Sequence, residues 1–465
     1  MKGKAKGRAK KKKVSRIVIA APGSGRGKTT FVSSLLALLK KHGEDVRAFK
    51  CGPDYIDPMF HESVLGIPSK NLDTFFCGEE LLRASLYEDR GSINVIEGVM
   101  GLYDGIGMTE KASTYELARI LNAPIILCVD AHGMGRSAAA VIKGFQAMDD
   151  AGLIRGVFLN RVSAGYYEKL APWLEETCGV PVVGFLPNMP DVILKSRHLG
   201  LESPEENEAV DKLSKAADKL EETLDLERLK QIADSAEPLD VTVRFDDVLP
   251  PVSSGRAVVA VAKDEAFSFF YKDNLTALQK CGLELRFFSP IRDQKLPEDA
   301  SALILYGGYP ELYAKELSAN VSMRESIRSA CEAGMPVIAE CGGFMYLQNK
   351  LETAEGSFDM VGVFPGTSKN NGKLIRFGYV RGTDGMSMMR GHEFHHFDVD
   401  DPGSAWTMTR EATGEEYPAM HVKNGVVAGF PHYYYYSDVS FVKRFAYAAQ
   451  AFANMARAMG RIGRS

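Results

Sequence analysis

A glycine-rich loop followed by Lys-Thr-Thr is the clearest chemical signal in the chain. The loop reads APGSGRGKTT over residues 21–30, between an apolar β-branched run and a segment with helical spacing. Glycines expose backbone N–H groups, a helix N-terminus favours anions, a lysine neutralises phosphate charge, and a threonine hydroxyl can bind Mg²⁺. The alternative is a glycine-rich turn without a ligand. The residues predicted to bind ATP are Gly25, Gly27, Lys28, Thr29 and Thr30.

Acidic residues follow two other apolar runs in this part of the chain. Glu97 closes the run INVIEG, and Asp54 and Asp57 lie in GPDYIDP, directly after the run VRAFKC. The carboxyl ends of parallel strands meet at one edge of a sheet, so these acids are expected beside the phosphate loop, where Mg²⁺ needs a carboxylate. Glu97 fits this role best, and Asp104 follows it in the loop GVMGLYDG. Any one of these acids could instead cap a helix.

A cysteine in the second half of the chain has the setting of a nucleophile. The strand-like run MPVIAE leads into Cys341-Gly342-Gly343, and the helical segment FMYLQNKL follows. A tight turn before a helix holds the sulfur outward, and the helix N-terminus lowers the pKa of the thiol. Gly307 and Gly308, in YGGYPEL, offer backbone N–H groups for an oxyanion. The alternative is a buried cysteine packed by glycines.

A cysteine nucleophile needs a histidine base within hydrogen-bond reach. The candidates are His392, His395 and His396 in GHEFHHF, together with His421 and His432. The GHEFHH segment also invites a metal-site interpretation, but it has neither the H-E-x-x-H spacing nor a helical pattern. Composition alone does not choose among these histidines.

The elements that must position these residues alternate along the chain. Continuous apolar runs alternate with helical segments, a pattern typical of parallel sheets covered on both faces. A Glu-, Lys- and Leu-rich stretch at 202–236 predicts one or two exposed helices before a Pro- and Ser-rich boundary. The expected organisation is a disordered basic tail over 1–13, an α/β domain over 14–200, a helical segment and linker over 201–255, and a second α/β domain over 256–460.

Composition excludes several classes of protein. Residues 1–16 carry nine of the 56 basic residues and none of the 60 acidic ones, so the rest of the chain is acidic and does not favour nucleic-acid binding. No run of apolar residues is long enough to span a membrane. The seven cysteines form no C-x-x-C pair, and no secretory signal precedes them. These observations predict a cytoplasmic protein with reduced thiols.

Taken together, the motifs resemble the cobyrinic acid a,c-diamide synthase family over about residues 14–450. The resemblance implies an N-terminal P-loop NTPase-type domain with a parallel sheet, similar to dethiobiotin synthetase. It also implies a C-terminal flavodoxin-like domain, similar to class I glutamine amidotransferases. Pro22, which replaces the first glycine of the usual G-x-x-x-x-G-K-T pattern, occurs in the dethiobiotin synthetase branch. The matching segments are APGSGRGKTT, GPDYIDPMFH, NLDTFF, IEGVMGLYDG, LNRV, RHLGL at 197–201, GGYPEL, AECGGFMYL and GHEFHH.

The resemblance assigns a role to the cysteine domain. Cys341 would attack the side-chain amide of glutamine, form a thioester and release ammonia. His432 would be its base, in preference to His392 or His395. Amidotransferases with a full triad have a glutamate two residues after this histidine, whereas Tyr434 stands there in this chain. The subgroup works without that acid, which leaves a Cys–His dyad.

The resemblance also assigns the chemistry of the first domain. ATP would phosphorylate an acetate carboxylate of cobyrinic acid, and ammonia, arriving by an internal route, would displace the phosphate. Thr29, Asp54 and Glu97 would hold Mg²⁺, and Asn160 would read adenine. Tyr55, Asp57 and Asp104 would bind the macrocycle.

Small molecules are the expected partners, namely cobyrinic acid, L-glutamine and ATP, with no nucleic acid and no membrane. A homodimer is the oligomer to test. Hydrogenobyrinic acid and nickel sirohydrochlorin are alternative substrates for the same chemistry. A ParA/MinD-like switch ATPase is a remote alternative, because it would require a lysine at position 23 and no cysteine domain, and the chain has Gly23 and Cys341.

Overall fold

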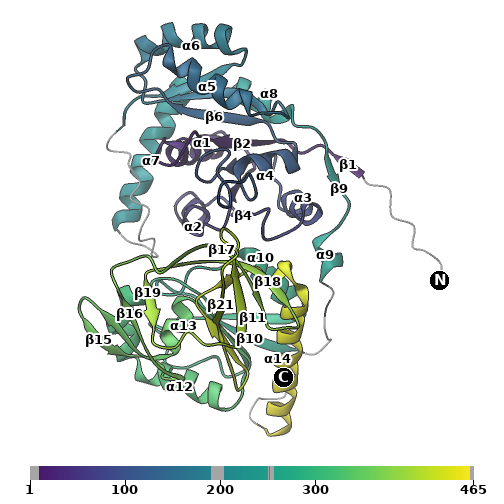
Figure 1. The fold of residues 1–465 in the computed structure, drawn as a ribbon, viewed down its shortest axis with the longest axis vertical. Coiled ribbons are helices and arrows are strands. Elements are labelled where there is room, and N and C mark those ends of the chain that lie inside the picture. Colours follow the sequence, from purple (N-terminus) through teal and green to yellow (C-terminus); the bar gives the residue numbers. More distant parts are fainter. Residues whose placement is uncertain (1–9, 190–203, 250, 252–255, 461–465) are drawn as a thin grey trace, which may run out of the picture. The chain divides into compact units, whose positions relative to one another are not determined.

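The computed structural model describes residues 10–189, 204–249, 251 and 256–460 and divides the chain into two compact units. The first unit is Met1–Phe245 and the second is Asp246–Ser465 (Figure 1). The RHLGL segment at 197–201 lies outside the described residues. Both units contain a parallel sheet with helices, so the α/β class predicted for both domains is confirmed.

The first unit is built on a seven-stranded sheet in which every neighbouring pair is parallel. The strand order is β4-β3-β5-β2-β6-β7-β8, and helices cover both faces (Figure 1). The strands are β2 (Arg16–Ala20), β3 (Val46–Cys51), β4 (Ser69–Leu72), β5 (Ile93–Glu97), β6 (Ile125–Asp130), β7 (Ile154–Asn160) and β8 (Val182–Leu186). The helices are α1 (Lys28–Lys41), α2 (Ile56–Ser63), α3 (Glu79–Glu88), α4 (Thr114–Leu121), α5 (Ser137–Ala147), α6 (Ala164–Cys178), α7 (Pro204–Thr223) and α8 (Leu226–Asp234).

The core of this unit explains why the charged helices α7 and α8 fold onto it. Leu213, Leu220 and Leu229 come from these helices and are buried with the apolar residues of α1 and the sheet. The sequence interpretation treated the helices as exposed, because charged residues outnumber apolar ones there. Leucines at helical spacing are enough to form one apolar face.

Part of the basic tail also takes regular structure. Strand β1 (Lys10–Lys12) pairs antiparallel with β9 (Leu239–Val241). The sequence interpretation placed these lysines in a disordered tail, because nothing in their composition indicates a core. Backbone pairing with β9 supplies the hydrogen bonds that composition does not reveal.

The second unit contains a six-stranded sheet of order β11-β10-β12-β13-β23-β22. All of its neighbouring pairs are parallel except the edge pair formed by β22 and β23. The strands are β10 (Ala257–Ala262), β11 (Leu283–Phe288), β12 (Ala300–Leu305), β13 (Val337–Glu340), β22 (His421–Lys423) and β23 (Val426–Gly429). The helices are α9 (Phe245–Val248), which begins at the boundary, α10 (Lys272–Lys280), the 3₁₀ helix η2 (Pro310–Tyr313), α11 (Ala314–Ala319), α12 (Val321–Glu332), α13 (Gly342–Leu347), the 3₁₀ helix η3 (Tyr435–Ser437) and α14 (Val439–Ala458).

A β-rich region follows α13 in the chain and, together with β24, which comes after β23, forms two further sheets. One has the order β15-β14-β16-β19 and the other β21-β20-β17-β18-β24. The strands are β14 (Gln348–Thr353), β15 (Gly356–Asp359), β16 (Phe364–Asn370), β17 (Arg376–Thr383), β18 (Met388–His395), β19 (Phe397–Val399), β20 (Trp406–Arg410), β21 (Glu416–Ala419) and β24 (His432–Tyr433). No helix in the described residues has the length and apolar character needed to cross a membrane.

Candidate functional site

The phosphate loop joins β2 to α1, and the residue directly before α1 must be glycine. Gly27 caps α1 with φ of 89°, a left-handed conformation that favours glycine. A side-chain carbon on Gly27 would also collide with Asn160. Asn160 ends β7, and its Nδ2 donates a 3.1 Å hydrogen bond to the Arg26 carbonyl. The structure thus places Asn160 against the loop that was predicted to bind phosphate.

Lys28 and Thr29 begin α1 and both reach Glu97. Thr29 Oγ1 donates a 2.6 Å hydrogen bond to Glu97 Oε1, and Lys28 Nζ lies 3.5 Å from the same oxygen. Glu97 is fully buried at the end of β5, which pairs with β2. The predicted proximity of these three side chains is therefore present in the fold.

Lys50 was missed by the sequence interpretation and lies at the centre of the acidic residues. Its Nζ is 3.3 Å from Glu97 Oε1 and 3.8 Å from Asp54 Oδ2, and it forms a short ion pair with Asp57. Burial opposes its charge, but Glu97, Asp57 and Asp54 outweigh burial and raise the pKa of Lys50. A lysine near the end of the strand-like run VRAFKC, beside the acidic GPDYIDP segment, was the signal that could have found it.

His61 is a second buried residue that the sequence did not single out. It lies on α2, with Nε2 3.7 Å from Glu97 Oε2 and Nδ1 3.2 Å from Ser69 Oγ. Burial lowers the pKa of His61 below its ordinary value, so the ring is neutral near pH 7. The neutral ring borders Glu97 without adding a positive charge.

The three residues predicted to bind the macrocycle differ in how exposed they are. Asp57 is buried in the ion pair with Lys50, and Tyr55 is buried just before α2. Asp104 is exposed, and its Oδ2 accepts a 2.9 Å hydrogen bond from the Gly101 N–H. The loop of Asp104 is joined to the phosphate loop, since Leu102 N donates to the Ala21 carbonyl at 3.0 Å. Of these three side chains, that of Asp104 is therefore the most accessible to a large ligand.

The oxygen atoms around Glu97 suit a magnesium ion better than a softer metal. Within the described residues, Glu97 Oε2 is buried and accepts no hydrogen bond. In the same part of the chain, no group of three His, Cys, Asp or Glu side chains is arranged to hold a metal alone. Mg²⁺ prefers one or two carboxylates together with substrate phosphates and water. Thr29 and Glu97 fit such a site directly, whereas Asp54 reaches it through Lys50.

In the second unit, Cys341 lies on a strained turn between β13 and α13. Its φ and ψ are 49° and −107°, which a non-glycine residue rarely adopts. The next residue, Gly342, packs tightly against the GGYPEL segment. A side-chain carbon at this position would lie only 3.1 Å from Gly308 N and 2.9 Å from Pro310 Cδ. The Gly308 backbone N–H is therefore close to the residue that follows the thiol.

The thiol of Cys341 is poorly ionised by itself. Burial raises the pKa of Cys341 to about 12, and the nearby charge of Glu311 adds to this effect. The Gly342 N–H acts in the opposite direction but is outweighed. A nucleophilic thiolate at this position therefore needs a base that takes the proton as the sulfur attacks.

His432 is the histidine most closely joined to this turn. It is buried on β24, and a side-chain carbon on Gly307 would collide with its Cε1. Its Nδ1 lies 3.8 Å from an oxygen of Glu340, the residue that precedes Cys341. The ring of His392 stacks on it with centroids 5.0 Å apart. Glycine at 307 is thus needed for the imidazole to approach the loop.

The other histidines have different surroundings. His395 stacks on Phe430 at 3.9 Å, and its Nδ1 lies 2.6 Å from the Phe397 carbonyl. His421 Nε2 lies 3.0 Å from the Asp401 carbonyl. His396 is exposed. These positions favour His432 as the base, with His392 supporting its ring.

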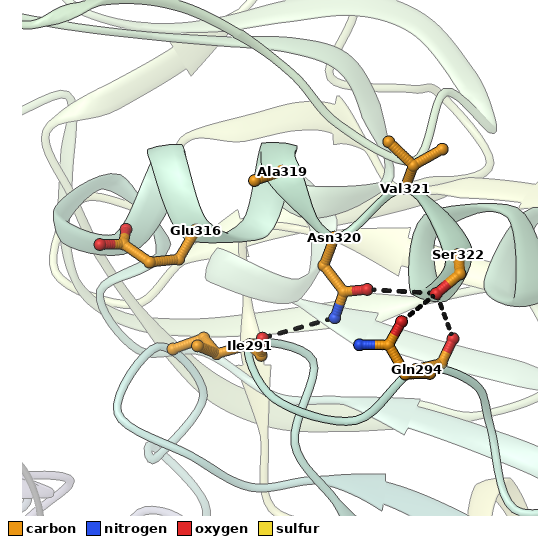
Figure 2. A pocket seen from close by; sticks show the side chains of 7 residues that line it. All are labelled: Ile291, Gln294, Glu316, Ala319, Asn320, Val321 and Ser322. Carbon is orange, nitrogen blue, oxygen red and sulfur yellow. Dashed lines mark hydrogen bonds between the residues drawn. The ribbon is translucent and has the colours of Figure 1, made fainter.

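An open hollow elsewhere in the second unit is not part of this site. Its polar side chains bond to one another: Ser322 Oγ donates to Gln294 at 2.8 and 2.9 Å, and Asn320 caps α12 (Figure 2). The lining residues are Ile291, Gln294, Glu316, Ala319, Asn320, Val321 and Ser322.

Comparison with known proteins matches both units. Residues 17–201 match the CobQ/CobB/MinD/ParA nucleotide binding domain, and residues 258–436 match the CobB/CobQ-like glutamine amidotransferase domain. A relative from Listeria monocytogenes serovar 1/2a, named cobyrinate a,c-diamide synthase, is 39% identical over 92% of this chain and 98% of its own. Relatives with the same name from Thermoplasma volcanium and Priestia megaterium are 38% and 36% identical, covering 93% and 94% of this chain and 97% of each relative.

Proposed function

Because the chain belongs to the cobyrinate a,c-diamide synthase family, we propose that it converts cobyrinic acid to its a,c-diamide with ATP and glutamine. The family predicted from the motifs is thereby confirmed. The observation that carries the proposal is identity of 36–39% through both units, in a chain that has a phosphate loop in one and a strained cysteine turn in the other. The small-molecule partners are cobyrinic acid, L-glutamine and ATP.

In the glutaminase reaction, Cys341 gives its thiol proton to His432 while the sulfur bonds to the amide carbon of glutamine. The carbonyl oxygen becomes an oxyanion. The predicted donors are the N–H groups of Gly307 and Gly308, and we propose that the Gly342 N–H beside Gly308 contributes while Gly307 lets His432 approach the loop. His432 then gives the proton to the amide nitrogen, and the C–N bond breaks to release ammonia. Water hydrolyses the thioester to glutamate and restores the thiol.

In the synthetase reaction, an acetate oxygen of the macrocycle attacks the γ-phosphorus of ATP, and ADP leaves. The resulting acyl phosphate is attacked by ammonia, and inorganic phosphate leaves as the amide forms. The N–H groups of Gly25 and Gly27, in the loop before α1, bind the phosphates together with Lys28 and Thr30 at the start of the helix. Thr29 and Glu97 would hold Mg²⁺, with Asp54 behind Lys50, and the bound ion would neutralise phosphate charge.

The assignments for the macrocycle and the nucleotide base are part of the same proposal. Asp104 is exposed beside the phosphate loop and is proposed to contact the macrocycle directly. Asp57 and Tyr55 were predicted to bind the macrocycle too; because both are buried, we propose that Asp57 acts indirectly by holding Lys50, while Tyr55 packs just before α2. Asn160, already bonded to the loop backbone, is proposed to face adenine.

The test is a mass-spectrometric assay with the pure protein, ATP, glutamine and cobyrinic acid. Each conversion of a carboxylic acid to an amide replaces OH by NH₂ and lowers the mass by one unit. Two successive losses, dependent on both ATP and glutamine, are expected. Parallel reactions with hydrogenobyrinic acid and nickel sirohydrochlorin test the choice of macrocycle. Amidation of one of these two, with none of cobyrinic acid, would contradict the proposed substrate.

A further inference from the structure

A buried carboxylate lies beside the base of the glutaminase site. Glu340 ends β13, directly before Cys341, and is 1% exposed. Its Oε2 is 3.8 Å from Nδ1 of His432, and its Oε1 is 3.5 Å from the Tyr433 backbone N–H. One acid side chain therefore borders both residues of the two-residue strand β24.

The position of Glu340 distinguishes the two nitrogens of the imidazole. Gly307 packs against Cε1, the carbon between them, and Glu340 is on the Nδ1 side. His392 covers one face of the ring with an interplanar angle of 15°. His392 is itself held, since Tyr271 Oη lies 3.0 Å from its Nδ1. A carboxylate at Nδ1 favours the tautomer with the proton there, which leaves Nε2 free to accept a proton.

Tyr434 stands where a full triad has its acid, but its side chain is bonded to a different part of the unit. Tyr434 Oη donates a 2.5 Å hydrogen bond to Asp273 Oδ2 on α10, and its neighbour Tyr435 is bonded through its backbone to Asn274. The Tyr434 side chain, directly after β24, therefore bonds to α10.

We propose that Glu340 is the acid partner of His432, a positioning residue that holds the proton on Nδ1 and stabilises the imidazolium formed when Cys341 is deprotonated. This proposal rests on the proposed glutaminase function. It turns the expected Cys–His dyad into a triad whose acid comes from the strand before the nucleophile. The proton moves from the thiol to Nε2, and the charge that appears on the ring is neutralised by the carboxylate.

Burial affects the two partners in opposite directions. It raises the pKa of Glu340 well above its ordinary value and lowers the pKa of His432 well below its own. Each charge alone is unfavourable in this environment, whereas the two charges together offset each other. The other ionisable groups that interact with the pair are Tyr306 after β12, Cys341 at the nucleophile turn, His392 and His395 on β18, and Tyr433 on β24; Glu311 and Glu393 act on Cys341 beside it.

The test compares Glu340→Gln, Glu340→Asp and a control, Glu332→Gln, in which an exposed acid at the end of α12 is replaced. Glutamate release from glutamine and ammonia-dependent amidation are measured on each protein. For Glu340→Gln we expect kcat for glutamine to fall about 100-fold or more with KM unchanged, as when a triad acid is neutralised. Ammonia-dependent amidation should stay at the wild-type rate. Glu340→Asp should recover part of kcat, and Glu332→Gln should match the wild type.

The contrary outcomes are equally clear. A folded Glu340→Gln protein with wild-type kcat, or one that loses ammonia-dependent amidation as well, would overturn the positioning role. If Glu340→Gln does not fold, the ¹⁵N spectrum of His432 in the wild-type protein decides: the proton on Nδ1 is expected, and the proton on Nε2 would overturn the proposal. A wild-type protein that releases no glutamate would instead contradict the proposed function.

Discussion

Thr29 Oγ1 donates a 2.6 Å hydrogen bond to Glu97 Oε1, joining the first turn of α1 to the end of β5. Lys28 and Lys50 reach the same carboxylate oxygen, at 3.5 and 3.3 Å. Glu97 is thus the point at which the phosphate loop, β3 and β5 are held together. A ligand that draws Thr29 or Lys28 toward phosphate must compete with this carboxylate or share it through a cation.

Lys28→Ala and Thr29→Ala should each abolish amidation of the macrocycle. Lys28 is expected to neutralise phosphate charge, and Thr29 is expected to help hold Mg²⁺. Glutamate release at Cys341 stays chemically possible in both variants, because that reaction uses no ATP. Product is measured by mass, and glutamate in a separate assay. A folded Lys28→Ala protein that makes diamide at the wild-type rate would show that the loop has been assigned wrongly.

Glu97→Gln and Asp104→Asn should have different defects. Glu97 is buried beside Thr29, so its neutralisation should raise the Mg²⁺ concentration needed for half-maximal activity. Asp104 is exposed, so its neutralisation should mainly weaken turnover of the macrocycle. Separate titrations of Mg²⁺ and of cobyrinic acid on both variants distinguish the roles. The same defect in both titrations would contradict the division.

Lys50→Met should destabilise the first unit strongly. It leaves Glu97 and Asp57 buried without their shared cation, and breaking a buried ion pair in this way costs about 3–5 kcal/mol. Lys41→Met is the control, because Lys41 pairs with Asp218 and Glu221 at the surface and should have a much smaller effect. Denaturant unfolding of both variants gives the comparison. Equal effects would mean that Lys50 is not held as the structure shows.

Alkylation of Cys341 in the absence of glutamine should depend steeply on pH. Its thiol has a pKa raised to about 12 by burial, so the thiolate fraction is small at neutral pH. The rate of reaction with iodoacetamide should rise about tenfold per pH unit between roughly pH 7 and pH 10. Mass spectrometry of the Cys341 peptide follows the reaction, with the His432→Ala protein for comparison. A rate that is already constant at pH 7 would instead reveal a preformed thiolate.

Local motifs made the two reactive turns predictable from sequence. The phosphate loop is a contiguous run that contains Gly27, Lys28 and Thr29, and it connects one strand directly to one helix. The same holds for Cys341, which lies between an apolar strand and a glycine pair. Parallel-sheet topology then places Glu97 next to the loop, because β5 pairs with β2.

The residues that the sequence did not reveal act through long-range contacts. Lys50 becomes a partner of Glu97 only when β3 and β5 pair, and Lys50 lies directly opposite Glu97 in that register. His61 depends on the packing of α2. Glu340 was read only as the last residue of a strand, because its partner His432 comes 92 positions later and is brought near by β24. The β-rich layer was missed because most of its strands are short and polar, without the continuous apolar runs that indicated the buried strands.

The central claim is that Cys341 supplies ammonia to a separate synthetase site, and Cys341→Ser tests it most directly. Glutamine-dependent amidation should fall by several orders of magnitude, because a covalent nucleophile is lost. Amidation with ammonium salt should continue, and it should improve at higher pH, where more free NH₃ is present. His432→Ala should behave in the same way. A folded Cys341→Ser protein that amidates with neither nitrogen source would contradict the claim, as would one that still uses glutamine at the wild-type rate.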